Sequence, residues 1–171
     1  MRLFITTLAV IATTATACFG QQDKSKRPSP PAEAKVTLAS GAQVSINYSQ
    51  PAAKGRTIGK EIAPFGKVWR TGANEATVFE TSANLTVNGQ ALPAGKYGLF
   101  TIPGEKEWIF IFNKTWNQWG SMSYKEADDV LRVTVPAQEA AAFAERMTFV
   151  VTANGELHLL WANTKLQLQL K

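Results

Sequence analysis

Cysteine and histidine are nearly absent from this sequence. Among its 171 residues there is one cysteine, Cys18, and one histidine, His158. A single cysteine excludes an intrachain disulfide framework and a cysteine-based zinc site, and a single histidine argues against a histidine-based metal site. We therefore expect no metal and no cofactor.

The motifs of most enzyme classes are also missing. The chain has no Gly-x-Ser-x-Gly motif to position a nucleophilic serine, and no glycine fingerprint for a dinucleotide. Residues 55–60 (GRTIGK) have the wrong spacing for a phosphate-binding loop, with no Ser or Thr after the lysine. Nucleophilic and cofactor-dependent enzymes are therefore disfavoured, and a function without catalysis is preferred.

Charge is sparse. Charged residues make up 18% of the chain and hydrophobic residues 45%, which is typical of a protein that folds. The formal net charge of +5 is small, and basic residues are interspersed with acidic ones, so nothing indicates a nucleic-acid partner. The length fits one domain, or one domain with an appendage.

The first twenty residues are organised like a secretory signal peptide. Arg2 supplies a positive charge, and residues 3–17 form an uncharged, apolar, Thr-rich run that is too short to span a bilayer comfortably. The small residues Ala15 and Ala17 have the spacing that signal peptidase recognises. We predict that residues 1–20 are a signal peptide and that the protein is exported, to the periplasm or beyond the cell.

The end of this segment leaves two outcomes open. Residues 15–18 (ATAC) resemble a weak bacterial lipobox, in which Cys18 would carry lipid and anchor the protein to the envelope. Leucine is missing three positions before Cys18, and the bulky Phe19 follows it. Cleavage after Ala17 or Gly20 would instead give a soluble protein, which we favour. Contact with a membrane is expected only through a lipidated Cys18.

Residues 21–34 differ in composition from the rest of the chain. This stretch (QQDKSKRPSPPAEA) holds three of the eight prolines and almost nothing that could be buried. It predicts a disordered tether. Residues 35–171 are then expected to form a single β-sandwich domain.

The hydrophobic pattern after Lys35 has the period of two that is typical of half-buried strands. Residues 44–48 and 166–170 alternate between apolar and polar side chains, whereas 108–112 (WIFIF) is apolar on both faces. Only residues 137–146 (AQEAAAFAER) favour a helix, through their Ala and Glu content. Further strands are expected near 76–81, 84–87, 96–102, 130–135, 147–152 and 156–161.

Turn signals separate these strands. Asn88-Gly89 and Asn154-Gly155 are typical of a type I′ hairpin turn, whose two central residues both need a positive φ. Pro93-Ala94-Gly95 predicts a further turn. Many short strands with frequent turns indicate an all-β fold, an antiparallel β-sandwich of undecided jelly-roll-like or immunoglobulin-like topology, with one short helix near 137–146.

The second Asn-Gly pair allows a prediction about His158. A two-residue loop at 154–155 would place Val151 opposite His158, on the sheet face that also carries Phe149 and Leu160. A lone histidine among apolar neighbours is usually a hydrogen-bonded core residue, and a catalytic histidine would need several partners nearby. We therefore predict a structural role for His158.

Two stretches, residues 66–77 and 113–132, are rich in side chains typical of binding sites. Flat aromatic rings among amide groups can stack on a sugar and hydrogen-bond its hydroxyls. The same side chains would also suit loops that cover the core, with Arg70–Glu75 and Arg132–Asp128 as ion pairs. We favour a non-enzymatic module that binds a polar ligand such as a carbohydrate or cell-envelope glycan, through Trp69, Arg70, Asn74, Glu75, Asn113, Trp116, Gln118, Trp119 and Tyr124.

Two alternative functions stay open. A glycosidase-like hydrolase would use Glu75 with Asp128 or Asp129 as acid and base, which requires a separation of roughly 5–9 Å between the carboxyl groups. An envelope scaffold would bind another protein and should expose an apolar patch.

Several segments of the chain together carry a recognisable pattern: residues 48–51 (YSQP), 55–56 (GR), 64–77 (PFGKVWRTGANEAT), 92–97 (LPAGKY), 99–103 (LFTIP), 108–120 and 129–133 (DVLRV). These segments resemble a family of exported bacterial proteins of unknown function, domain of unknown function 2911. The resemblance spans roughly residues 36–170. It implies an exported setting and supports the fold, but no catalytic residue can be transferred from it.

Overall fold

The structure is a computed structural model that describes residues 23–171. The predicted signal peptide, residues 1–20, and Cys18 therefore lie outside the described residues. Strands dominate the described part of the chain, and its helical segments are two short 3-10 turns, η1 (Lys24–Lys26) and η2 (Glu126–Asp128). In this part of the chain, no helix has the length and apolar character needed to cross a membrane.

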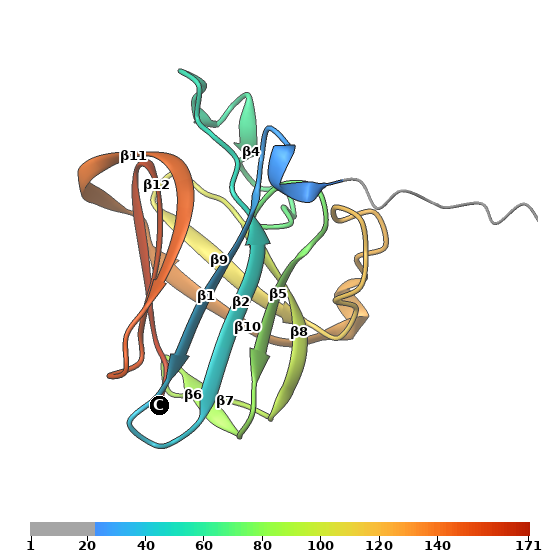
Figure 1. Ribbon diagram of the computed structural model, residues 1–171, viewed down its shortest axis with the longest axis vertical. Helices are drawn as coiled ribbons and strands as arrows, with labels where there is room; N and C mark the ends of the chain where they lie inside the picture. Colours follow the sequence, from blue (N-terminus) through green and yellow to red (C-terminus); the bar gives the residue numbers. More distant parts are fainter. Residues whose placement is uncertain (1–22) are drawn as a thin grey trace, which may run out of the picture.

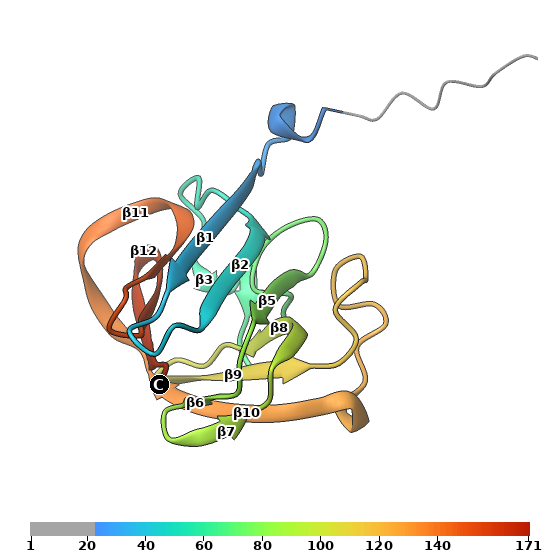
Figure 2. The same cartoon turned by 60° about the horizontal axis from the view of Figure 1, so that its bottom comes forward.

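A six-stranded antiparallel sheet forms one layer of the fold (Figure 1). The sheet curves so that both of its edge strands contact the hairpin described next, β1 against β11 and β10 against β12 (Figure 2). Across the sheet, the strands follow the order β1 (Pro31–Thr37), β2 (Gln43–Ser49), β5 (Thr77–Thr81), β8 (Gly95–Ile102), β9 (Glu107–Asn113) and β10 (Asp129–Pro136).

The second layer is a long hairpin of β11 (Gln138–Val151) and β12 (Glu156–Gln169). The core lies between this hairpin and the inner face of the six-stranded sheet. Together the two layers form the all-β antiparallel sandwich that the sequence predicts. Two minor pairs complete the fold: parallel β3 (Ile58–Gly59) and β4 (Ile62–Pro64), and antiparallel β6 (Leu85–Val87) and β7 (Gln90–Leu92).

Period-two alternation decides which face of each strand is buried. On β2, Val44, Ile46 and Tyr48 are buried against the core, whereas Ser45 and Asn47 lie on the opposite, outer face of the sheet. Over β1, β2 and β5 this outer face carries mainly polar side chains, with Pro31 and Val78 as apolar exceptions. Over β8 and β9 it is covered by a second, smaller cluster built on Ala76, Phe100 and Ile111.

The predicted helix near 137–146 is wrong. Residues 138–151 form strand β11, which pairs with β12 from Gln138 opposite Lys165 to Val151 opposite Leu157, with register shifts on either side of Ala144. The alanines of this segment are mostly exposed or half-buried. Helix propensity differs between ordinary residues by less than about 0.7 kcal/mol each, so the hydrogen bonds offered by a long partner strand outweigh it.

The structure also moves the start of the ordered domain. Strand β1 begins at Pro31, and Pro31 and Ala34 pair with Ser49 and Ile46 of β2. Residues 31–34, which composition assigned to a tether, are thus part of the sheet. Three of the preceding residues, Lys24, Arg27 and Ser29, also contact the domain, at Glu75 and Asn74. Composition missed this because strand β1 is an edge strand whose side chains are mostly exposed.

The two Asn-Gly pairs form turns of different length. Asn88 and Gly89 have φ angles of 48° and 82° and join Val87 to Gln90 in the predicted two-residue turn. At the second turn, the Thr152 N–H donates to the Glu156 carbonyl, so the loop has three residues, 153–155.

The longer loop shifts the register of the β11–β12 hairpin by one residue. Val150, and not Val151, lies opposite His158. His158 therefore shares its face with Val150 and Leu160, while Phe149 packs in the core with Leu159. The His158 Nε2 atom is buried and has no hydrogen-bond partner among residues 23–171; the nearest acidic oxygen is Glu156 Oε2, at 4.0 Å.

Candidate functional site

Trp69 is partly buried and packs against the core. Its backbone exchanges two hydrogen bonds with Thr101, at 2.8 and 2.9 Å, which extends the sheet past Thr77, the first residue of β5. This pairing turns the indole inward, where it stacks on Trp161 with ring centroids 5.3 Å apart and meets the edge of Trp108 at 6.2 Å. The ring is thus used to join the two layers.

The ion pair between Arg70 and Glu75, which the sequence left open as an alternative, does not form. Glu75 is instead bound by Lys24, whose Nζ lies 3.0 Å from Oε1, and by Arg27, whose Nη1 lies 3.0 Å from Oε2. Partial burial by itself raises the pKa of Glu75, but hydrogen bonds from its own backbone N–H and from these two cations outweigh it and hold the pKa at about 2. Arg70 pairs with no carboxylate in the described part of the chain.

Glu75 and Asn74 together fasten the segment before β1. The Asn74 amide donates to the Ser29 carbonyl at 3.1 Å, and Asn74 adopts a φ of 60°, a conformation that asparagine tolerates better than most residues. Both side chains are therefore engaged within the protein, where they order residues that composition had assigned to a tether.

Asn113 and Gln118 tie down the loop between β9 and β10. The Asn113 side chain is fully buried, donates to the Lys125 carbonyl and to Asp129 Oδ1, and accepts from the Thr115 N–H. Gln118 donates to the Thr115 carbonyl at 2.7 Å and accepts from the Ser123 N–H at 2.9 Å. Both N–H donors of Asn113 are used within the loop, and Gln118 uses its oxygen and one of its two N–H donors in the same way.

Tyr124 belongs to a closed hydrogen-bond network. Its hydroxyl donates to Asp129 Oδ2 at 2.7 Å and accepts from Arg132 Nη2 at 2.9 Å, while Arg132 Nε donates to the same Asp129 oxygen. Burial, reinforced by the Asp129 hydrogen bond, raises the pKa of Tyr124 to about 12. The predicted Arg132–Asp128 pair is replaced by pairs of Arg132 with Asp129 and Glu126.

Of the aromatic residues proposed for the site, only Trp116 and Trp119 are open to solvent, with 36% and 56% of their surface exposed. Lys96 Nζ lies 4.2 Å from the centroid of the Trp116 ring, close enough for a cation–π interaction. Both residues belong to the loop that follows β9, and this loop lies on the opposite side of the molecule from the β11–β12 hairpin (Figures 1 and 2).

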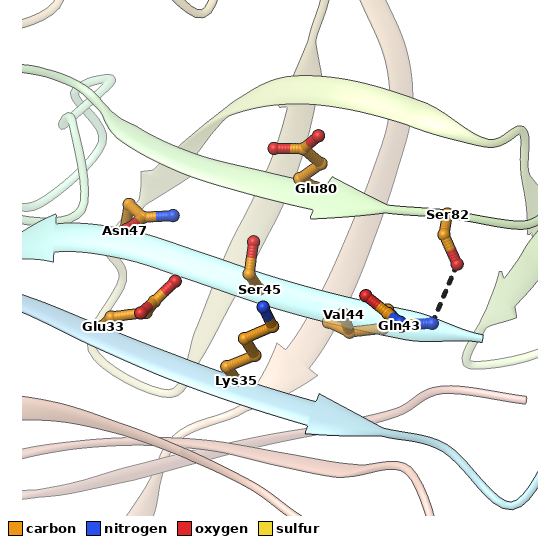
Figure 3. Close-up of a pocket in the computed structure, with 8 residues that line it drawn as sticks. All are labelled: Glu33, Lys35, Gln43, Val44, Ser45, Asn47, Glu80 and Ser82. Carbon is orange, nitrogen blue, oxygen red and sulfur yellow. Dashed lines mark hydrogen bonds between the residues drawn. The ribbon is translucent and has the colours of Figure 1, made fainter. Parts of the chain in front are cut away.

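The structure reveals a hollow that the sequence analysis missed. It has a volume of about 300 Å³ and lies on the outer face of the six-stranded sheet, over β1, β2 and the end of β5 (Figure 3). We call it the outer-face hollow. Its lining is polar apart from one residue, and consists of Glu33, Lys35, Gln43, Val44, Ser45, Asn47, Glu80 and Ser82.

A row of residues that lie opposite one another on neighbouring strands connects this hollow to Trp116. Lys35 lies opposite Ser45, Ser45 opposite Glu80, and Glu80 opposite Lys96 on four consecutive strands. Glu80 and Lys96 form an ion pair at 3.7 Å, and Lys96 covers the Trp116 ring. A continuous row of polar side chains thus ends at a half-exposed indole.

A second hollow continues the first along the outer face. It has a volume of about 180 Å³, shares Asn47 with the outer-face hollow, and extends past Val78 to Glu75 and Lys24. Within residues 23–171, no three His, Cys, Asp or Glu side chains are grouped to hold a metal ion. The chemistry that this face offers is hydrogen bonding and ring stacking.

Comparison with known proteins agrees with the resemblance seen in the sequence. A family model described as a protein of unknown function, DUF2911, matches residues 29–170. No curated protein and no solved structure matches the chain. The match begins close to β1 and ends with the last strand pairing, so it covers the whole sandwich. The chain belongs to the DUF2911 family.

Proposed function

We propose that this protein is an exported, non-enzymatic module that binds a glycan chain along the outer face of its six-stranded sheet. The observation that carries the proposal is the outer-face hollow, whose polar lining leads through the Glu80–Lys96 pair to Trp116. Sugar hydroxyls both donate and accept hydrogen bonds, so a site for them needs both kinds of partner. Glu33 and Glu80 supply acceptors, Lys35 supplies donors, and Asn47 supplies both.

Trp116 supplies the second feature that a glycan-binding surface needs, an aromatic ring. A pyranose ring has an apolar face of C–H groups that packs against an aromatic ring. The Trp116 indole is half-exposed, and Lys96 on one side leaves part of the ring open at the end of the polar row. The charges near the hollow balance, with Glu33 and Glu80 against Lys35 and Lys96, which suits a neutral glycan better than a highly charged one.

The geometry gives a hydrolase no support. Glu75 is held ionised by two cations, so it has no proton to deliver at neutral pH. Asp129 accepts from Asn113, Tyr124 and Arg132, and Asp128 accepts from the Thr115 hydroxyl at 3.1 Å. Each of these carboxylates is thus committed to the loop structure around it.

A protein-binding scaffold is a second candidate, favoured by one observation. Trp119 and Met122 expose 56% and 85% of their surface on the same loop, and large exposed apolar side chains close together are typical of interaction sites. This surface and the outer-face hollow share no lining residue, so separate substitutions test the two functions.

The test of glycan binding uses calorimetric titration with soluble oligosaccharides, among them chitohexaose and peptidoglycan-derived fragments. Ser45→Trp should fill the hollow from its floor and abolish binding without touching the core. Trp116→Ala should weaken binding at least about tenfold, which is about 1.4 kcal/mol. Trp119→Ala is the matched control and should bind like the wild type. Binding that survives both Ser45→Trp and Trp116→Ala would remove the outer face from this role.

Export is tested separately. The mature protein should be recovered outside the cytoplasm with its first residue after Ala17 or Gly20, read by N-terminal sequencing. Recovery of a lipid-modified Cys18 by mass spectrometry would favour the anchored alternative. Retention of residues 1–17 would contradict both.

A further inference from the structure

Two buried hydrogen-bond donors without an acceptor belong to residues that line the same cavity. They are Arg70 Nε and Trp161 Nε1, and neither has a partner among residues 23–171. The cavity has a volume of about 270 Å³ and is formed where the 69–73 segment and β12 meet the β3–β4 pair. It shares no lining residue with the outer-face hollow, so the inference below does not rest on glycan binding.

Both donors are held in place by packing. Trp161 is almost completely buried, and its ring stacks on that of Trp69, with an interplanar angle of 10° and ring centroids 5.3 Å apart. The Arg70 guanidinium itself abuts the loop before η2: a Cβ on Gly120 would lie 3.4 Å from Arg70 Nη1. A buried donor without an acceptor costs about 1–3 kcal/mol, and native proteins leave few of them.

The cavity has an excess of positive charge. Its lining includes Arg56 and Arg70 against one acidic residue, Glu61. Arg56 is partly engaged by the Ala52 and Ala53 carbonyls, and Glu61 accepts from the Thr57 N–H. Arg70 has no counter-ion in the described part of the chain, and burial lowers its pKa, which shows that its charge is poorly solvated there.

We propose that this cavity binds a small organic carboxylate, whose oxygens accept hydrogen bonds from the Arg70 guanidinium and from the Trp161 N–H. One excess positive charge matches a monoanion, and a carboxylate matches the fork of a guanidinium. Trp69, Ile62 and Ala63 offer an apolar wall for the body of the ligand. Because both nitrogens are shielded from solvent, the carboxylate reaches them only after a small displacement of the side chains that cover them.

The experiment follows the indole N–H signals of the five tryptophans by ¹H–¹⁵N NMR during titration of the mature protein. Benzoate is the first probe, acetate tests the need for the apolar body, and inorganic phosphate tests the anion class. We expect a saturable shift of the Trp161 signal with benzoate, and at least a tenfold weaker response with phosphate. Saturation by phosphate at the same concentration would overturn the assignment to carboxylates.

Variants separate the site from non-specific binding of anions. Arg70→Gln should weaken the benzoate response at least tenfold, whereas Lys67→Gln removes the same charge from an exposed neighbour outside the cavity and should leave it unchanged. Arg70→Lys keeps the charge but loses the guanidinium geometry, and the other four indole signals report whether each variant is folded. The proposal is overturned by equal responses in wild type and Arg70→Gln, by a shift that does not saturate, or by a crystal structure grown in benzoate with only water at these donors.

Discussion

Gly98 of β8 lies directly beneath the backbone of Trp116. A Cβ on Gly98 would stand 2.9 Å from the Thr115 carbonyl oxygen and 3.2 Å from the Trp116 Cα. The absence of a side chain at this position lets the loop after β9 rest on the sheet. The position of the half-exposed indole at the end of the polar row is therefore decided by a residue eighteen positions earlier in the chain.

Gly98→Ala should lift this loop. We expect a loss of about 1–3 kcal/mol in the free energy of unfolding, typical of adding a methyl group where packing is tight. Urea unfolding measures the loss, and the Trp116 indole signal should move in the ¹H–¹⁵N spectrum. A variant with wild-type stability and an unmoved Trp116 signal would show that the loop does not depend on Gly98.

Trp69 and Trp119 are both candidates for the binding site, but replacing each by alanine should reduce the stability of the protein by very different amounts. Trp69→Ala removes a ring stacked on Trp161 and should cost about 3–5 kcal/mol of stability. Trp119→Ala removes a ring that is 56% exposed and should change stability by no more than about 0.5 kcal/mol. Denaturant unfolding of the two variants side by side measures the difference, and similar losses would contradict the division between core and surface.

The ion pairs of Glu75 should contribute a pH-dependent part of stability. Its pKa is lowered from 4.5 to about 2, so the contribution is present above pH 4.5 and is lost as the pH falls toward 2. Because the carboxylate is 40% exposed, solvent screens it, and we expect Glu75→Gln to cost no more than about 1 kcal/mol at pH 7. Unfolding measured from pH 7 to 2 should show the wild type and the variant converging in this window. Curves that stay parallel would show that the pairs do not stabilise the fold.

His158 should make the protein less stable as the pH falls below neutrality. Burial, with a smaller effect from Lys165, lowers its pKa below 6.5, so the unfolded chain binds the proton more readily than the folded one. Stability is therefore full above pH 6.5 and declines as the pH drops from 6.5 toward the folded pKa. It is the only histidine in the sequence, so His158→Gln should flatten the stability profile between pH 7 and 5.5. A histidine ring signal that titrates at or above 6.5 would contradict the lowered pKa.

Much of the fold was predictable because strands leave a local signature. The alternation at 44–48 gave both the strand and its buried face, and Asn88-Gly89 gave a hairpin turn of the right length. At Asn154-Gly155 the same signal predicted a loop that is one residue too short. The predicted sheet faces of Val150 and Val151 were therefore exchanged. Side chains alternate with a period of two, so a single extra loop residue moves every later side chain to the other face.

The candidate site was less predictable than the fold. Trp, Asn, Gln and Tyr side chains in the two long loops have the same composition whether they bind a ligand or fasten the loops. Asn113 and Tyr124 show the second outcome, since each is satisfied by groups within the protein. The outer-face hollow was not predicted at all, because Lys35, Ser45, Glu80 and Lys96 are far apart in the chain and only strand register brings them into one row.

By itself, the sequence determined the β class and the membership in a family described as of unknown function. These follow from composition, periodicity and extended motifs, which are properties of short or contiguous segments. The tertiary structure alone decided that residues 138–146 are part of a strand, that Glu75 binds the segment before β1, and that Arg70 and Trp161 line one cavity. Each of these depends on a partner distant in the chain, and local propensities of a few tenths of a kcal/mol do not specify which partner that is.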